Sequence, residues 1–169
     1  YVECILENAL KHDSRPGLEI TGNLQNVMKE STHIAYSFAK SVMARQFPEN
    51  QFFEKAKVHL HCPEGAVPKD GMWNFYAMVN KSAANHSKGP SAGITMASAL
   101  LSLALNHSLE PTVAMTGELT VTGKVLRIGG LREKTVAARR AGATKILFPA
   151  DNTSDWLELP EVSHKTIHS

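Results

Sequence analysis

The longest apolar run of the chain, residues 94–105, limits the possible folds more than any other feature. It contains Thr95, Ser98 and Ser102 and is about 12 residues long. A helix that crosses a bilayer needs about 20 apolar residues, so this run is too short to span a membrane. A helix that is apolar on most sides is covered by other parts of the protein instead. The run therefore predicts a buried helix.

Strand patterns and helix patterns alternate around this run. After Asn23, apolar residues recur at spacings of three and four until Pro48, which predicts a helix. Gly142 is expected to end another helix, and Gly123 to lie at the turn of a hairpin. We expect strands at 1–8, 18–21, 57–62 and 145–148, the hairpin at 118–128, and helices at 23–47, 91–106 and 131–141. This order predicts an α/β (or α+β) fold with some parallel strand pairing.

The same patterns predict which side chains are buried. The strand at 145–148, which Pro149 closes, should be buried, and His59 and His61 should share one face of their strand. Two such histidines could hold a metal ion, but no third ligand is nearby, which favours a solvated or hydrogen-bonded strand face. The first helix should bury the face that contains Leu24, Val27, Met28, Ala35, Phe38, Ala39 and Val42.

Size and charge exclude several classes of protein. A chain of 169 residues fits one domain, and we expect residues 1–169 to form one. The net charge of +2, from 18 basic and 16 acidic residues, indicates neither a nucleic-acid nor a membrane partner. Cys4 and Cys62 do not make a disulfide framework and suggest a reducing compartment. Because the chain opens inside a strand pattern without a signal peptide, we expect a fragment of something longer.

Ser91 is a candidate nucleophile, since it lies among small residues where a loop should lead into a helix. Free N–H groups at the start of that helix could stabilise an oxyanion. The alternative is an ordinary serine that caps the helix. A reactive serine also needs a base, and a lysine made neutral by its surroundings can act as one.

Lys134 is the candidate for that base. It lies in the first turns of the helix expected at 131–141, just after Gly129 and Gly130. The helix dipole disfavours a positive charge there, so the pKa of the lysine should fall, as a general base requires. The alternative is a surface lysine without a catalytic role.

Four segments carry a resemblance to a known family: Pro63–Gly71, Gly89–Met96, Ala114–Glu118 and Arg127–Ala138. In this order they resemble the proteolytic domain of the Lon proteases, and most closely that of the mitochondrial Lon proteases of fungi. The resemblance runs from about residue 1 to about residue 160. It implies a ribosomal protein S5 domain 2-like fold and a serine–lysine dyad that cleaves peptide bonds.

The resemblance also implies a role for individual residues. Ser91 would be the nucleophile and Lys134 the general base, Thr116 would support the lysine by a hydrogen bond, and Asp70 and Glu64 would line the approach to the serine. Members form homo-hexameric rings that degrade misfolded or unneeded proteins, here expected in the mitochondrial matrix. ATP and Mg would belong to a separate ATPase domain, because this chain has no Gly-x₄-Gly-Lys-[Ser/Thr] motif. No cofactor, metal, membrane or DNA partner is expected for the chain itself.

Residues 72–89 depart from the family pattern. Their removal would join Asp70-Gly71 directly to Pro90-Ser91 and restore it. The codons for Gly71-Met72-Trp73 can contain an intron donor, so a retained intron or a gene-model error is one explanation. A natural insertion loop is the other. After about residue 161 we expect the C-terminal segment of the family to be missing or divergent.

Three functions are therefore open. The first is an ATP-dependent serine endopeptidase domain, and the second is a catalytically impaired or mis-spliced remnant of that domain. The third is a nucleic-acid-binding α/β module. The near-zero net charge and the absence of interleaved aromatic and basic residues on a strand count against the third.

Overall fold

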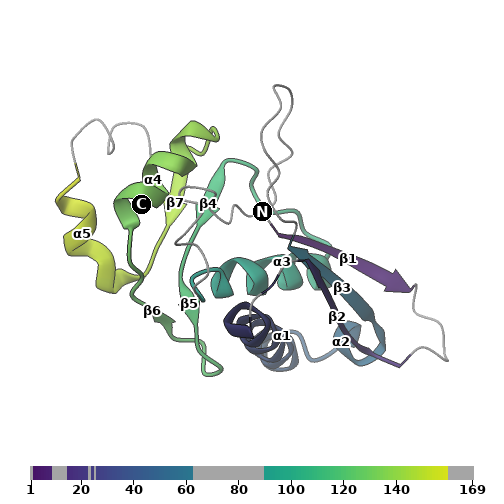
Figure 1. Ribbon diagram of the computed structural model, residues 1–169. Helices are drawn as coiled ribbons and strands as arrows, with labels where there is room; N and C mark the ends of the chain where they lie inside the picture. The colour runs from purple at the N-terminus through teal and green to yellow at the C-terminus, as the bar shows by residue number, and fades with distance from the viewer. Residues whose placement is uncertain (1, 9–14, 23, 25, 63–89, 160–169) are drawn as a thin grey trace.

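The computed structural model describes residues 2–8, 15–22, 24, 26–62 and 90–159 (Figure 1). Residues 72–89, which depart from the family pattern, therefore lie outside the described residues. The elements in chain order are β1 Glu3–Asn8, β2 Gly17–Gly22, α1 Asn26–Gln46, α2 Phe52–Lys55, β3 Lys57–Cys62, α3 Gly93–Leu105, β4 Val113–Met115, β5 Glu118–Leu119, β6 Val125–Leu126, α4 Leu131–Arg140, β7 Lys145–Leu147, the 3₁₀ turn η1 Ala150–Asn152 and α5 Thr153–Leu157.

A three-stranded sheet, in the order β1-β3-β2, occupies one side of the molecule (Figure 1). β1 runs antiparallel to β3, and β2 runs parallel to it. The alternation in β3 follows the predicted pattern, because Val58 and Leu60 are fully buried while His59 and His61 lie on the opposite face. The expected strands and some parallel pairing are confirmed.

Helices α1 and α3 pack against each other beside this sheet. α3 is the apolar run of the sequence, and Met96 and Leu100 on it have no exposed surface. The prediction of a buried helix is confirmed. The predicted apolar face of α1 is correct for Met28, Ala35 and Ala39 but wrong for Val27, which is 46% exposed. Val27 directly precedes Met28 in the first turn of α1, so its side chain points about 100° around the helix from the buried Met28.

A second apolar cluster joins β4, β7, α4 and α5. It contains Ala114 of β4, Ile146 of β7, Leu131 and Ala138 of α4, and Trp156 of α5. β4 and β7 pair in parallel, and Figure 1 shows them beside α4. The expectation of a buried strand at 145–148 is correct only for Ile146 of β7, because Lys145 is exposed and Leu147 is 51% exposed. A strand that pairs on one side and packs on one face buries alternate residues only.

Two of the expected chain reversals rest on glycines. Gly123 has a φ of +91° at the turn between β5 and β6, and Gly142 has a φ of +86° just after α4. Both predictions are confirmed. The start of α3 differs from the expectation, because the helix begins at Gly93 with Ala92 as its N-cap, and Ser91 makes no capping bond. Ser91 therefore lies in the turn before the helix. No helix in the part of the chain that the structure describes is long and apolar enough to cross a membrane.

Candidate active site

Ser91 and Lys134 come together although 43 positions separate them in the chain. The Lys134 Nζ lies 3.0 Å from the Ser91 Oγ, which is hydrogen-bond distance. Ser91 is in the turn before α3, and Lys134 is in the first turns of α4. Both residues are half-buried. The structure thus brings together the two residues that the sequence predicts as nucleophile and base.

The surroundings of Lys134 favour its neutral form. Burial lowers the pKa of the Lys134 ammonium below the ordinary lysine value. The direction agrees with the sequence-based expectation, and its cause is the removal of the ammonium from water. A lysine that loses its proton more easily can accept one from a neighbouring hydroxyl. The pair therefore has the geometry and the electrostatics of a nucleophile with its base.

Thr116 lies beside the pair, but its contact differs from the expected one. Its hydroxyl donates to the carbonyl oxygen of Ser91 over 3.3 Å, and not to Lys134. The backbone N–H of Gly117 donates to the same carbonyl oxygen over 2.8 Å. Thr116 follows directly after β4, which places its hydroxyl next to the serine backbone. Both hydrogen bonds fix the position of the Ser91 carbonyl group.

Some of the amides expected to be free at the start of α3 have partners. The Gly93 N–H donates to the Pro90 carbonyl, and the Ile94 N–H donates to the Gly117 carbonyl, each over 3.2 Å. These two groups are therefore engaged in positioning the turn around Ser91. Residues 89–93 fit the letters Gly-x-Ser-x-Gly, but the partner of Ser91 is Lys134, so the histidine-dependent elbow does not describe this site.

Asp70 and Glu64, the two acidic residues expected near the serine, lie outside the described residues. Their placement stays a prediction.

The two histidines of β3 form a hydrogen-bonded strand face. The Thr21 hydroxyl lies 2.7 Å from the His59 Nε2 and 2.7 Å from the His61 Nδ1. Among the residues that the structure describes, no three histidine, cysteine or acidic side chains gather as a metal site would require.

Burial raises the pKa of Cys4 to about 12 and that of Cys62 to about 11, so both thiols stay protonated and unreactive.

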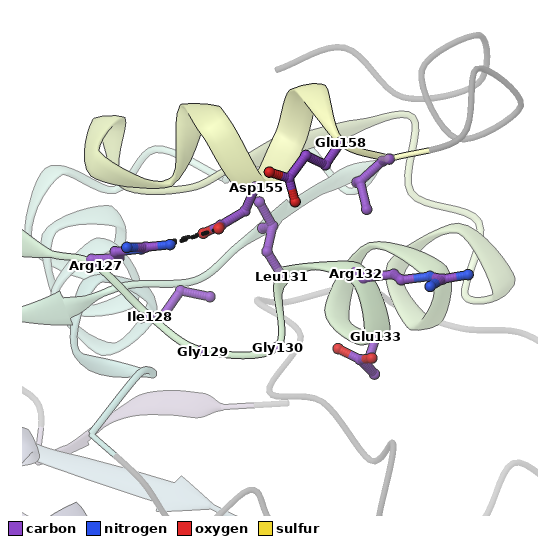
Figure 2. Close-up of a pocket in the computed structure, with 10 residues that line it drawn as sticks. Arg127, Ile128, Gly129, Gly130, Leu131, Arg132, Glu133, Asp155 and Glu158 are labelled. Atoms are coloured by element: carbon purple, nitrogen blue, oxygen red, sulfur yellow. Dashed lines mark hydrogen bonds and ion pairs between the residues drawn. The ribbon is translucent and has the colours of Figure 1, made fainter.

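A cavity of about 590 Å³ lies next to α4 but does not include Ser91 or Lys134 (Figure 2). It is bounded by the loop Arg127–Gly130, the first turn of α4 and the helix α5. Asp155 and the fully buried Asn152 lie near this cavity. The sequence does not predict a functional role for either residue. Asparagine and aspartate beside a helix start look like ordinary caps, so no sequence signal marked them.

A serine and a half-buried lysine in contact on an α/β domain define a class of candidate serine hydrolases that use lysine as the base. The comparison with known families is more specific. The chain belongs to the family described as "Lon protease (S16) C-terminal proteolytic domain", whose model matches residues 3–85 and 81–168.

Individual relatives agree with this assignment. The chain is 76% identical over 161 residues to the "Lon protease homolog, mitochondrial" of Aspergillus niger. It is 60% identical over 161 residues to the protein of the same name from Saccharomyces cerevisiae. Each match covers 95% of this chain and 13% of the relative. The chain thus spans about an eighth of the length of these curated relatives.

Proposed function

We propose that this chain is the proteolytic domain of an ATP-dependent serine endopeptidase that degrades misfolded or unneeded proteins. The observation that carries the proposal is the 3.0 Å contact between the Ser91 Oγ and the Nζ of a lysine whose pKa burial lowers. Membership in the proteolytic-domain family and the names of the fungal relatives support it.

In the proposed reaction, the Ser91 Oγ attacks the carbonyl carbon of a peptide bond while neutral Lys134 accepts the hydroxyl proton. The lysine then gives this proton to the departing amine as the peptide C–N bond breaks, which leaves an ester on Ser91. Water attacks the ester, its proton passes to Lys134, and the Ser91 oxygen takes a proton back when the new carboxylic acid leaves. Thr116 and Gly117 hold the serine carbonyl throughout, because both donate to it.

The remaining parts of the proposal concern the protein that carries this domain. ATP and Mg would act in a separate ATPase domain, and six copies would form the ring. The substrates would be unfolded or damaged proteins. The names of the relatives support a mitochondrial location, which we place in the matrix. DNA and membrane binding are not assigned to this domain.

Substitution of each proposed catalytic residue tests the mechanism. In the full-length protein, Ser91→Ala and Lys134→Ala should each abolish hydrolysis of an unstructured fluorogenic peptide. Lys134→Arg should fail as well, because a guanidinium stays protonated. Lys124→Arg, at an exposed hairpin position, is the matched control and should keep full activity. Normal turnover by Lys134→Arg would refute the assignment of the base.

A second candidate function, an impaired form of the same domain, rests on residues 72–89. The family model matches in two segments that overlap at residues 81–85, inside this stretch. The match therefore breaks where the family pattern is interrupted. An insert there separates Asp70 from Ser91, and a displacement of about 1 Å at a catalytic group can cost about 10²-fold in rate.

Deletion of the insert distinguishes the two candidates. We expect the full-length protein without residues 72–89 to hydrolyse peptides faster than the protein that retains them. The fold should survive in both, because the entropy of loop closure grows only slowly with loop length. Equal rates would identify the stretch as a natural loop that the active site tolerates.

A further inference from the structure

The helix that carries Lys134, α4, follows a pair of glycines, which we call the glycine joint, and no side chain caps its start. α4 starts after Gly129 and Gly130, and its N-cap Gly130 has a φ of +69° and offers no side-chain capping bond. Two successive glycines leave the chain free to adopt many conformations. The direction of the helix, and with it the position of the Lys134 Nζ, must therefore be set by contacts on either side of the glycines.

On the N-terminal side of the joint, one side chain holds the backbone at two points. The Asn152 Oδ1 accepts a hydrogen bond of 3.0 Å from the Ile128 N–H, and the Asn152 Nδ2 donates one of 2.8 Å to the Ile128 carbonyl. Asn152 has no exposed surface. Two bonds from one planar amide fix both the position and the orientation of the residue that precedes the glycines.

The orientation of Asn152 is itself determined by an ion pair. Its second N–H donates to the Asp155 Oδ2 over 2.5 Å. The Arg127 guanidinium binds the same carboxylate with two bonds, of 2.6 and 3.3 Å. Figure 2 shows the two side chains pointing toward each other. Hydrogen bonds from Arg127 and, to a smaller extent, from Asn152 lower the pKa of the Asp155 carboxyl. We call the four residues Arg127, Ile128, Asn152 and Asp155 the amide clamp.

The amide clamp connects to the serine side through β7. Asn152 follows β7 after only Phe148, Pro149 and the start of η1. The Leu147 carbonyl at the end of β7 accepts a hydrogen bond of 2.9 Å from the Thr116 N–H, and Thr116 donates in turn to Ser91. One continuous set of contacts thus leads from the serine carbonyl to the backbone before the lysine helix.

We propose that Asn152 is a positioning residue for Lys134, which it holds against Ser91 by fixing the backbone of Ile128 ahead of the glycine joint. The effect on catalysis rests on the proposed function, whereas the effect on the environment of the lysine does not. Loss of the clamp lets α4 move away from the serine, so Lys134 becomes more exposed to water and its catalytic contact lengthens.

The main test variant is Asn152→Asp in the full-length protein. Aspartate has nearly the same shape and can still accept from the Ile128 N–H, but it turns an oxygen toward the Ile128 carbonyl and toward Asp155. Asp155→Asn is a milder variant at a partly exposed site, which keeps the experiment informative if Asn152→Asp does not fold. The matched control is Thr153→Val, which removes an exposed hydroxyl that donates to the Ala150 carbonyl in the same turn.

The first readout does not depend on peptidase activity. Competitive acetylation across a pH series, followed by mass spectrometry of the peptide that contains Lys134, measures the pKa of this one amine. The pKa should rise toward the ordinary lysine value in Asn152→Asp, rise less in Asp155→Asn, and stay unchanged in Thr153→Val. In peptide hydrolysis, kcat should fall about 10- to 100-fold in Asn152→Asp with KM unchanged, and the acid limb of the pH profile should move to higher pH.

The outcomes separate the positioning role from the function. A loss of stability alone would lower the amount of folded protein and leave the pH limb and the Lys134 pKa as in the wild type. Folded variants with an unchanged Lys134 pKa would overturn the positioning role. A protein that hydrolyses no peptide but shows the expected acetylation pattern would retain the positioning role and refute the proposed function.

Discussion

Gly117 is the position where one added methyl group tests the geometry of the site most directly. Its N–H donates to the Ser91 carbonyl and its own carbonyl accepts from Ile94, so it holds the serine turn on both sides. A Cβ at Gly117 would overlap the Val125 Cγ1 and would lie 3.4 Å from the Ile94 Cγ2 and 3.6 Å from the Pro149 Cγ. The overlap with Val125 exceeds about 1 Å relative to ordinary carbon–carbon contact.

Gly117→Ala can relieve this overlap in two ways, and both have a cost. Val125 is β-branched with a stiff χ1, so moving it disturbs the β5–β6 hairpin, and overpacking of this kind costs about 1–3 kcal/mol of stability. If the backbone at residue 117 moves instead by about 1 Å, the Ser91 carbonyl moves with it and the rate falls about 10²-fold. We expect both a lower urea midpoint and a lower kcat.

The assay compares peptide hydrolysis and urea unfolding in the wild type and three variants. Gly117→Ala should lose activity and stability, and Val125→Ala in the same chain should restore part of both, because it removes the overlapping methyl group. Gly17→Ala is the matched control, since a Cβ there has no atom within 4 Å. Wild-type activity and stability in Gly117→Ala, or no rescue by Val125→Ala, would refute the reasoning.

Three further changes give independent tests. Lys134→Met should abolish turnover yet raise the stability of the fold at pH 7. Because burial lowers the pKa of Lys134, burying its charge costs stability at low pH, and this cost disappears as the pH rises toward the ordinary lysine pKa. The stability gained by Lys134→Met, measured by urea unfolding, should therefore be smaller at pH 10 than at pH 7. Thr95→Val should cost about 1–3 kcal/mol, since it removes a buried 3.0 Å bond to the Met115 carbonyl, whereas Thr95→Ser should cost less. Asn106, with a φ of +49° after α3, should tolerate glycine but lose about 1–2 kcal/mol as valine.

Each of these tests has an outcome that contradicts it. Equal pH dependence of stability in wild type and Lys134→Met would mean that the lysine is not held in a site that disfavours its charge. Equal unfolding midpoints for Thr95→Val and Thr95→Ser would show that the hydroxyl bond is not what matters there. A stable Asn106→Val would contradict the left-handed conformation at the end of α3.

The element order was readable from the sequence because it depends on local patterns. The alternation in β3, the apolar run of α3 and the glycine after α4 report the period and the ends of single elements, and the structure agrees with all three. Motif order was also enough to select Ser91 and Lys134. It could not show their distance, because no local pattern encodes how two helices from separate motifs lie relative to each other.

Only the tertiary structure shows which contacts surround the pair of Ser91 and Lys134. Thr116 donates to the Ser91 carbonyl and not to Lys134 because the end of β4 lies beside the serine turn. Val27 fits the helical period of α1 yet is exposed, since burial depends on what packs against each turn. Asn152 looks like a capping residue in the sequence and becomes a buried support because the turn after β7 faces Ile128. Hydrogen-bond partners depend on positions in space, whereas sequence periodicity specifies only which face of its own element a residue occupies.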